Sequence, residues 1–138
     1  MPQRWDKLKS VPLQNVGLVS KSDKIPMMFH ELKRTRLDRV IVKDNENLVG
    51  IVTLRDIFTK LASKKFSNIS PKSLSIASFM SENFFHVLED NTIDDVIKLM
   101  AEKNVSGVPV LDKKRKLLGI ITKNYLINLV ANELKGYV

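Results

Sequence analysis

Leu48-Val-Gly-Ile-Val-Thr-Leu-Arg-Asp56 and Leu117-Leu-Gly-Ile-Ile-Thr-Lys-Asn-Tyr125 are two copies of one pattern. The glycines and threonines inside them are 69 positions apart, whereas earlier identical pairs, such as Val19 with Val87, are 68 positions apart. The added residue therefore lies between Asp112 and Leu117, in a polar turn where a change of length is tolerated. Because a repeat fixes the architecture before any single residue suggests chemistry, the chain is interpreted as a tandem duplication.

Length and composition limit the class of protein. The chain has 138 residues, 43% of them hydrophobic and 28% charged, which is typical of one globular domain or of two small repeats sharing a core. No apolar run approaches the roughly 18 residues that cross a bilayer, and the N-terminus lacks a signal-peptide core. We therefore expect a cytoplasmic protein with no membrane partner. With no cysteine and only two histidines, we expect no metal site.

The net charge of +8 favours anionic partners. Basic residues gather between Lys33 and Arg39 and again in Lys113–Lys116. These groups have two interpretations, as solvated turns that aid solubility or as contacts to nucleic acid.

Each copy predicts the order strand, helix, strand, strand, helix. In the second copy the strand at 84–88 precedes Thr92, an N-cap with Asp94 and Asp95 in the first turn. Apolar residues then recur at helical spacing, and a hairpin joins Val105–Leu111 to Leu117–Ile121 before the last helix. The first copy predicts strands at 16–19, 39–42 and 48–52, an amphipathic helix that includes Ile25, Met28, Phe29 and Leu32, and a closing helix from Asp56 to Ala62 with Phe58 among its apolar positions.

The domain boundaries follow from composition. We expect an N-terminal lead-in at 1–9, a first repeat at 10–66, a linker at 67–75 that is rich in serine and interrupted by proline, and a second repeat at 76–138. Trp5 is expected to anchor the lead-in on the core.

The motifs resemble a known family. Val105-Ser-Gly-Val-Pro-Val-Leu-Asp112 with the following Gly-Ile-Ile-Thr122, and Gly50-Ile-Val-Thr-Leu-Arg-Asp56, are similar to the core and closing motifs of the cystathionine-β-synthase (CBS) domain. The resemblance covers about residues 10–135 and occurs twice. It implies an α/β fold of two βαββα repeats packed with pseudo-twofold symmetry, called a Bateman module. Such pairs often bind adenosine-containing ligands in two clefts, form homodimers and regulate a partner rather than catalyse.

The resemblance also implies a first ligand site. Gly50 would allow close approach of a ligand or another backbone, Thr53 would meet a phosphate at the helix N-terminus, and Asp56 would accept the ribose hydroxyls. The family combines this motif with residues of the other repeat, which would be Phe85, Val105, Ser106 and Pro109 around the adenine. The ligand would be AMP, ADP, ATP or an S-adenosyl compound, held as a regulatory ligand and not as an obligatory cofactor.

The same two residues have a simpler interpretation. Thr53-x-x-Asp56 also matches a helix capping box, which stabilises a helix by about 1 kcal/mol without any ligand. Capping and binding are compatible, so both interpretations stay open.

The second cleft departs from the family pattern. Thr122 is present, but Tyr125 stands where the family has its aspartate, and a tyrosine cannot accept two ribose hydroxyls as a carboxylate does. The residues expected opposite it are Arg36, Leu37, Asp38 and Arg39, whose basic groups suit phosphate. We expect this cleft to be altered or empty, and the alternative is a different ligand stacked on Tyr125.

Three functions follow from these observations. The first is a sensor that binds an adenosyl ligand at Thr53/Asp56 and signals through a dimer to an unidentified effector protein. The second is a nucleic-acid-associated protein, and the third is a purely structural dimerisation module. We expect no enzyme, because no Walker-type glycine loop or histidine–cysteine nucleophile is present and Asp94-Asp95 lie in the first turn of a helix. His30 and His86 are interpreted as surface and packing residues.

Overall fold

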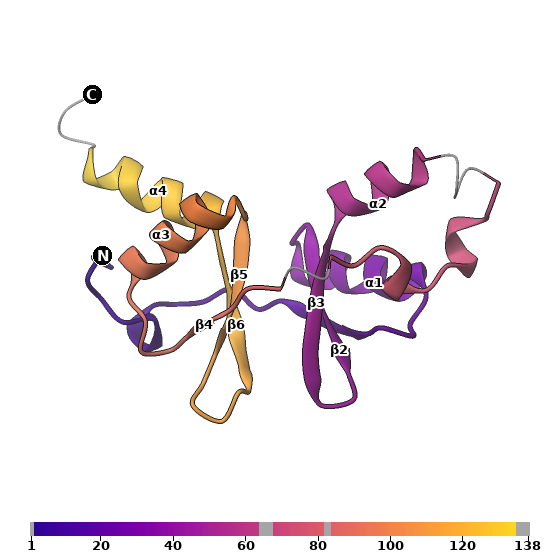
Figure 1. Cartoon of the computed structure of the whole chain (residues 1–138). Coiled ribbons are helices and arrows are strands. Elements are labelled where there is room, and N and C mark those ends of the chain that lie inside the picture. The colour runs from indigo at the N-terminus through magenta and orange to yellow at the C-terminus, as the bar shows by residue number, and fades with distance from the viewer. Residues whose placement is uncertain (1, 64–67, 82–83, 135–138) are drawn as a thin grey trace. The chain divides into compact units, whose positions relative to one another are not determined.

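The computed structural model describes residues 2–63, 68–81 and 84–134 and divides into two compact units. The repeat-one unit is Val16–Phe84, and the repeat-two unit joins Met1–Asn15 to Phe85–Val138. The two units carry the same fold (Figure 1). The predicted end of the first repeat at Phe66 and the start of the linker at Ser67 lie outside the described residues, as do Met1 and 135–138.

The repeat-one unit has the predicted βαββα order. Its elements are β1 (Gly17–Ser20), α1 (Ile25–Thr35), β2 (Arg39–Asp44), β3 (Asn47–Thr53) and α2 (Leu54–Leu61), followed by the short 3₁₀ helices η3 (Pro71–Ser73) and η4 (Ile76–Ser78). In the sheet β1–β2–β3, β1 is parallel to β2 and β2 is antiparallel to β3. The parallel pair requires α1 as the crossover, and the antiparallel pair is a hairpin.

The repeat-two unit repeats this arrangement after a short 3₁₀ helix, η1 (Leu8–Ser10). Its elements are β4 (Val87–Leu88), α3 (Ile93–Lys103), β5 (Gly107–Leu111), β6 (Leu117–Thr122) and α4 (Lys123–Glu133), with the sheet order β4–β5–β6. Both the predicted α/β class and the two-repeat organisation are confirmed.

Each unit has its own apolar core, built from the helical and strand faces that the sequence pattern predicted. In the repeat-one unit the buried residues include Val40, Val42 and Met28, and in the repeat-two unit they include Val108 and Val110. Phe29 and Phe58 were expected on the apolar faces of their helices, but they are 48% and 70% exposed.

The segments that precede the two opening strands, β1 and β4, are exchanged between the units. The segment before β1 packs in the unit that contains β4, and the segment before β4 packs in the unit that contains β1. Leu8, from the start of the chain, is completely buried in the core of the repeat-two unit, whereas Ile76, 68 positions later, is completely buried in that of the repeat-one unit. The backbone contacts match: Leu8 N–H donates to Asn91 O, and Ile76 N–H donates to Asp23 O. We call residues 2–14 the N-terminal arm and residues 74–81 the linker arm. Each repeat therefore contributes an arm to the unit of the other.

Trp5 does not anchor the N-terminal arm, because its side chain is 73% exposed. The arm is held instead by Leu8, which is completely buried, and by Val11, which is 6% exposed. The prediction was wrong because it took the largest apolar residue of the lead-in as the buried one, whereas the backbone turn at Leu8–Ser10 points the smaller aliphatic residues inward.

The extra residue of the second repeat lies in the β5–β6 turn, as predicted. Asp112 organises this turn, since its Oδ1 accepts hydrogen bonds from the backbone N–H groups of Lys114 at 2.8 Å and Lys116 at 2.9 Å. Arg115 has a φ of 66°, and in the shorter β2–β3 turn Asn45 has a φ of 55°. Both turns therefore contain one residue in the left-handed region.

Candidate functional site

The N-terminus of α2 is closed by two reciprocal hydrogen bonds. The backbone N–H of Asp56 donates to Thr53 Oγ1 at 3.1 Å, and the backbone N–H of Thr53 donates to Asp56 Oδ2 at 2.9 Å. The capping box considered from the sequence is therefore present. Both residues are half-buried, and Asp56 Oδ1 accepts no hydrogen bond from the residues that the structure describes. The motif caps the helix through one oxygen of the Asp56 carboxylate.

The cap lies beside the turn that precedes β2. The N–H of Leu54, the first residue of α2, donates to the backbone oxygen of Asp38 at 2.9 Å, and Arg39 pairs with Thr53 across the β2–β3 hairpin. The antiparallel register thus brings Thr53 close to Asp38 and Arg39 within one unit. The family resemblance assigned Thr53 to the first cleft and the other two residues to the second.

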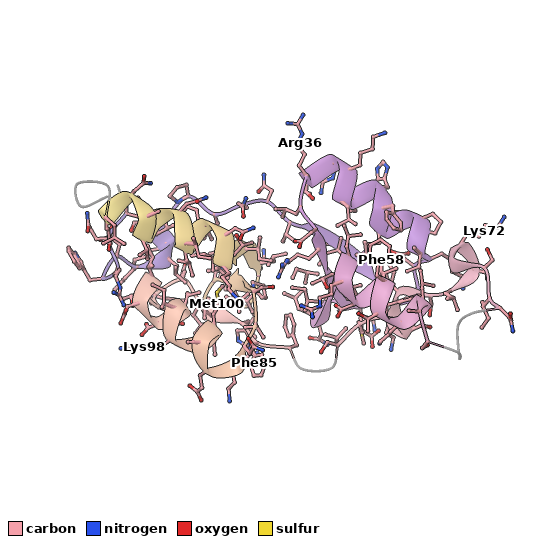
Figure 2. All side chains as sticks on the ribbon, turned by 90° about the horizontal axis from the view of Figure 1, so that it is seen from above. Arg36, Phe58, Lys72, Phe85, Lys98 and Met100 are labelled. Carbon is pink, nitrogen blue, oxygen red and sulfur yellow. The ribbon has the colours of Figure 1, made fainter. Side chains whose placement is uncertain are left out.

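Arg39 is the buried charged residue of the described chain, with its side chain only 9% exposed. Its Nε donates to Asp38 Oδ1 at 2.9 Å and its Nη2 to Oδ2 at 3.3 Å. This bidentate contact holds the pKa of Asp38 below its usual value. Arg36, by contrast, is exposed at the end of α1, where its φ of 60° terminates the helix, and its side chain projects outward (Figure 2). Leu37 between them is half-buried.

The equivalent junction of the repeat-two unit, where β6 leads into α4, carries different side chains. Thr122 caps α4 by accepting the N–H of Tyr125 at 3.3 Å, Lys123 N–H donates to Ser106 O at 2.8 Å, and Gly107 pairs with Thr122. Tyr125 supplies no carboxylate, and its ring packs against the core of this unit, where burial raises the pKa of its hydroxyl. The capping box is thus reduced to a single hydrogen bond.

The strand glycines are sites of close backbone approach. A Cβ on Gly50 would lie 3.2 Å from Ser81 O, and one on Gly119 would lie 2.8 Å from Gln14 O. The arms occupy these positions, since Ser81 bridges to Ile51 and Gln14 to Ile120. Of the two uses considered for Gly50, the contact found in the structure is with another backbone.

The residues predicted around the adenine all belong to the repeat-two unit. Phe85 and Val105 pack at the edge of its core, Ser106 is exposed, and Pro109 is buried in β5. Lys103 Nζ lies 5.7 Å from the centre of the Phe85 ring, within range of a cation–π contact. The predicted first site therefore takes Thr53 and Asp56 from one unit and these four residues from the other, and their combination remains a prediction.

The carboxylates Asp94 and Asp95 cap a helix and form ion pairs. Asp95 forms a capping box with Thr92, and this hydrogen bonding lowers its pKa. Asp94 pairs with Lys98 and Arg4, which lower its pKa as well. His30 is exposed on α1. Within the described ranges, no group of three His, Cys, Asp or Glu side chains could hold a metal ion.

A hollow on the repeat-two unit was not predicted. It lies between α3 and α4, has a volume of about 370 Å³ and is mostly apolar, with Ile97, Met100, Ala101, Asn104, Lys123, Leu126, Ile127 and Val130 as its lining. Ile127 on its rim is 54% exposed. In the sequence, this surface is indicated by Ile127, an apolar residue of α4 beside the buried Leu126 and Leu129. Ile127 is equivalent to Phe58 of α2, which is labelled in Figure 2.

Comparison with protein families and with known proteins shows what the chain is similar to. The model of the CBS domain matches the chain twice, at residues 8–63 and 76–132. The uncharacterised protein MK0525 of Methanopyrus kandleri is 30% identical over 105 residues, and a homoserine O-acetyltransferase of Methanosphaera stadtmanae is 35% identical over 89 residues. The matches cover 71% and 64% of this chain, but only 52% and 16% of those relatives. The chain thus spans about half of one relative and a small part of the other.

A solved structure shares the fold. The CBS domain pair of protein MJ0100, in complex with 5′-methylthioadenosine and S-adenosyl-L-methionine, matches with a TM-score of 0.77 and 25% sequence identity. The match covers 94% of this chain and 98% of that one. Among the described residues, no helix has the length and apolar character needed to cross a membrane.

Proposed function

The chain belongs to the CBS domain family, and we propose that it is a regulatory module that binds one adenosine-containing ligand per chain at Thr53/Asp56. The observation that carries the proposal is the capping box of α2, in which Asp56 Oδ2 holds the helix and Oδ1 accepts no hydrogen bond from the described residues. The similar MJ0100 domain pair binds two adenosyl compounds. We propose a ligand of the same chemical class here.

Asp56 would accept the ribose hydroxyls. A carboxylate already oriented by one hydrogen bond loses little side-chain entropy when it accepts another, and hydrogen bonds to charged groups contribute about 1.5–3 kcal/mol each. Phe85, Val105, Ser106 and Pro109 of the repeat-two unit would surround the adenine, as the family resemblance implies.

The hydrogen bonds already made at the N-terminus of α2 favour one class of ligand over another. Two of the first N–H groups of α2 already have acceptors, because Leu54 donates to Asp38 O and Asp56 donates to Thr53 Oγ1. A phosphate would have to compete with these contacts. This favours an adenosyl compound without phosphate, such as S-adenosylmethionine or 5′-methylthioadenosine, over AMP, ADP or ATP.

The proposed stoichiometry of one ligand per chain follows from the side chains at Thr122 and Tyr125, where β6 leads into α4. Tyr125 supplies no carboxylate at the position equivalent to Asp56, and Arg39, expected to serve this cleft, is engaged by Asp38. A ribose-binding group is therefore missing there, and we propose that the Thr122/Tyr125 cleft does not bind the same ligand.

Calorimetric titration of the whole chain with S-adenosylmethionine, 5′-methylthioadenosine, AMP and ATP tests this function. We expect micromolar binding of at least one adenosyl compound with one ligand per chain. A stoichiometry of two would contradict the assignment of the second cleft. Absence of heat with all four compounds would overturn the sensor function and favour a structural dimerisation module.

We further propose that the module signals through a homodimer to an effector protein and performs no catalysis. Phe58 on α2 and Ile127 on α4 occupy equivalent positions in the two units, and both are apolar and more than half exposed. In each unit such an exposed apolar side chain is suited to a contact with a partner chain.

Phe58→Glu is expected to break this dimer, because a carboxylate would be buried without a partner. Sedimentation equilibrium should report twice the 15.7 kDa chain mass for the wild type and a single chain for the variant. Leu18→Glu is the matched control, since Leu18 is also an exposed apolar residue of the same unit but lies on β1. A monomeric wild type would contradict the proposed homodimer.

A further inference from the structure

A basic surface joins the N-terminal arm to the β5–β6 turn. Lys9 Nζ lies 3.1 Å from Asp90 Oδ1, Lys7 Nζ lies 3.9 Å from the same oxygen, and Lys113 Nζ lies 3.7 Å from Asp90 Oδ2. One carboxylate therefore collects three ammonium groups from two segments that are distant in the sequence. The exposed Lys114, Arg115 and Lys116 continue this surface along the turn.

The cations are not required by the fold. The equivalent turn of the repeat-one unit is Asp44-Asn-Glu-Asn47, and the linker arm carries Ser75 and Ala77 where the N-terminal arm carries Lys7 and Lys9. Both turns need a residue in the left-handed region, a conformation that asparagine tolerates better than arginine. The repeat-one turn has Asn45 there, whereas the repeat-two turn has Arg115. The repeat-two unit thus keeps a cation where its fold would favour asparagine.

An aromatic side chain lies next to this surface in the sequence. Trp5 is 73% exposed, two residues before Lys7. The backbone around it is fixed to α3, because Asp94 N–H donates to Arg4 O at 2.8 Å and Ile93 N–H donates to Asp6 O at 3.1 Å. The Arg4 guanidinium also pairs with Asp94 at 2.6 Å. An indole exposed on a backbone held by hydrogen bonds has the geometry that base stacking requires.

From these observations we propose that the repeat-two unit binds single-stranded nucleic acid through a basic surface formed by Lys7, Lys9 and Lys113–Lys116, with Trp5 as the stacking residue. The ammonium and guanidinium groups would contact backbone phosphates, and the indole would stack on one base. A base is accessible to the indole only where it is not already stacked in a duplex, which favours a single strand. The cations lie in a turn and an arm rather than on an amphipathic helix, which disfavours a membrane surface.

Trp5 makes the test direct, because it is the only tryptophan of the chain. The whole protein is titrated with a uridine 12-mer and, separately, with a thymidine 12-mer, and tryptophan fluorescence is recorded. Neither oligomer contains adenine, so the proposed adenosyl site does not contribute. We expect quenching that saturates, with an affinity that falls as salt is raised. Quenching with both oligomers indicates phosphate and base as the shared chemistry, whereas quenching by one alone restricts the ligand to RNA or DNA.

Two triple variants with the same change of charge locate the surface. In the test variant Lys113, Lys114 and Lys116 become glutamine, and Arg115 is kept for its backbone conformation. In the control variant the exposed Lys24, Lys33 and Lys72 of the repeat-one unit become glutamine (Lys72 is labelled in Figure 2). We expect the test variant to weaken binding about tenfold or more and to reduce the slope of log Kd against log salt by about 2, since single strands contribute about 0.7 per phosphate contact. Equal losses in both variants would overturn the assigned surface.

Trp5→Ala and Trp5→Phe test the stacking residue, with binding followed by the anisotropy of a labelled uridine 12-mer. We expect a loss of about fivefold or more with alanine and a smaller loss with phenylalanine, because a base stacks on any aromatic ring. Equal binding of duplex DNA and no effect of Trp5→Ala would overturn the single-strand proposal. A blue shift of Trp5 with phosphatidylserine vesicles, without quenching by either oligomer, would assign the surface to a membrane instead.

Discussion

Asp56→Ala is expected to weaken binding of the adenosyl ligand on the order of 100-fold. The variant removes a carboxylate that would accept the ribose hydroxyls, and two hydrogen bonds to a charged group contribute about 3 kcal/mol or more together. It also removes half of the capping box, because Thr53 N–H loses its acceptor Asp56 Oδ2. The free energy of unfolding should therefore fall by about 1 kcal/mol. Calorimetric titration measures the first effect, and urea denaturation measures the second.

The chain provides a matched control in Asp95→Ala. Thr92 and Asp95 form the same capping box at the start of α3, with distances of 2.9 Å and 3.1 Å that equal those at α2. This variant should lose about the same stability and keep its ligand affinity. If Asp56→Ala bound the ligand as tightly as Asp95→Ala does, Asp56 would be a helix cap alone and the proposed site would be wrong.

Leu8→Ala is expected to lower the free energy of unfolding by about 2–5 kcal/mol, a large part of the roughly 5–15 kcal/mol that stabilises a domain. Leu8 is completely buried among the core residues of the repeat-two unit, so truncation leaves a cavity there. The loss should be localised. Amide hydrogen exchange should accelerate in β5 and β6, although the substitution lies in the segment that precedes β1.

Ile76→Ala is the reciprocal variant and should accelerate exchange in β2 and β3, because Ile76 is buried in the core of the repeat-one unit. Leu18→Ala, at an exposed position of β1, should change neither unit by more than about 0.5 kcal/mol. Faster exchange in β2 and β3 with Leu8→Ala would contradict the exchange of arms.

The fold was predictable because a duplicated core must repeat its apolar positions. The spacing of 68 residues joins Val40 to Val108 and Val42 to Val110, and all four are completely buried in the central strands of their sheets. Helix termini were also predictable, since the side chains that cap them are adjacent in sequence. The capping boxes at Thr53 and Thr92 are examples.

The exchange of arms could not be predicted, because spacing shows that Leu8 and Ile76 are equivalent but not which core each one enters. Local patterns carry no information on contacts between distant segments. Nor does the apolar pattern show that Trp5 is exposed and Arg39 buried. For the candidate site, the residue types and the helix caps formed by Thr53 at α2 and Thr122 at α4 could be predicted from the sequence. How Thr53 and Asp56 combine with Phe85 and Val105 remains a prediction from family resemblance.

The exchange of arms also has a consequence during synthesis on the ribosome. Residues 16–84 form an uninterrupted segment that contains a complete unit, so this unit has all its parts before the rest of the chain is made. The N-terminal arm leaves the ribosome before β1, but Leu8 finds its core only when β6, which ends at Thr122, has been translated. At about 5–20 residues per second, the arm stays without its core for on the order of 5–20 s. The arm is thus translated before the rest of both units but is among the last segments to fold.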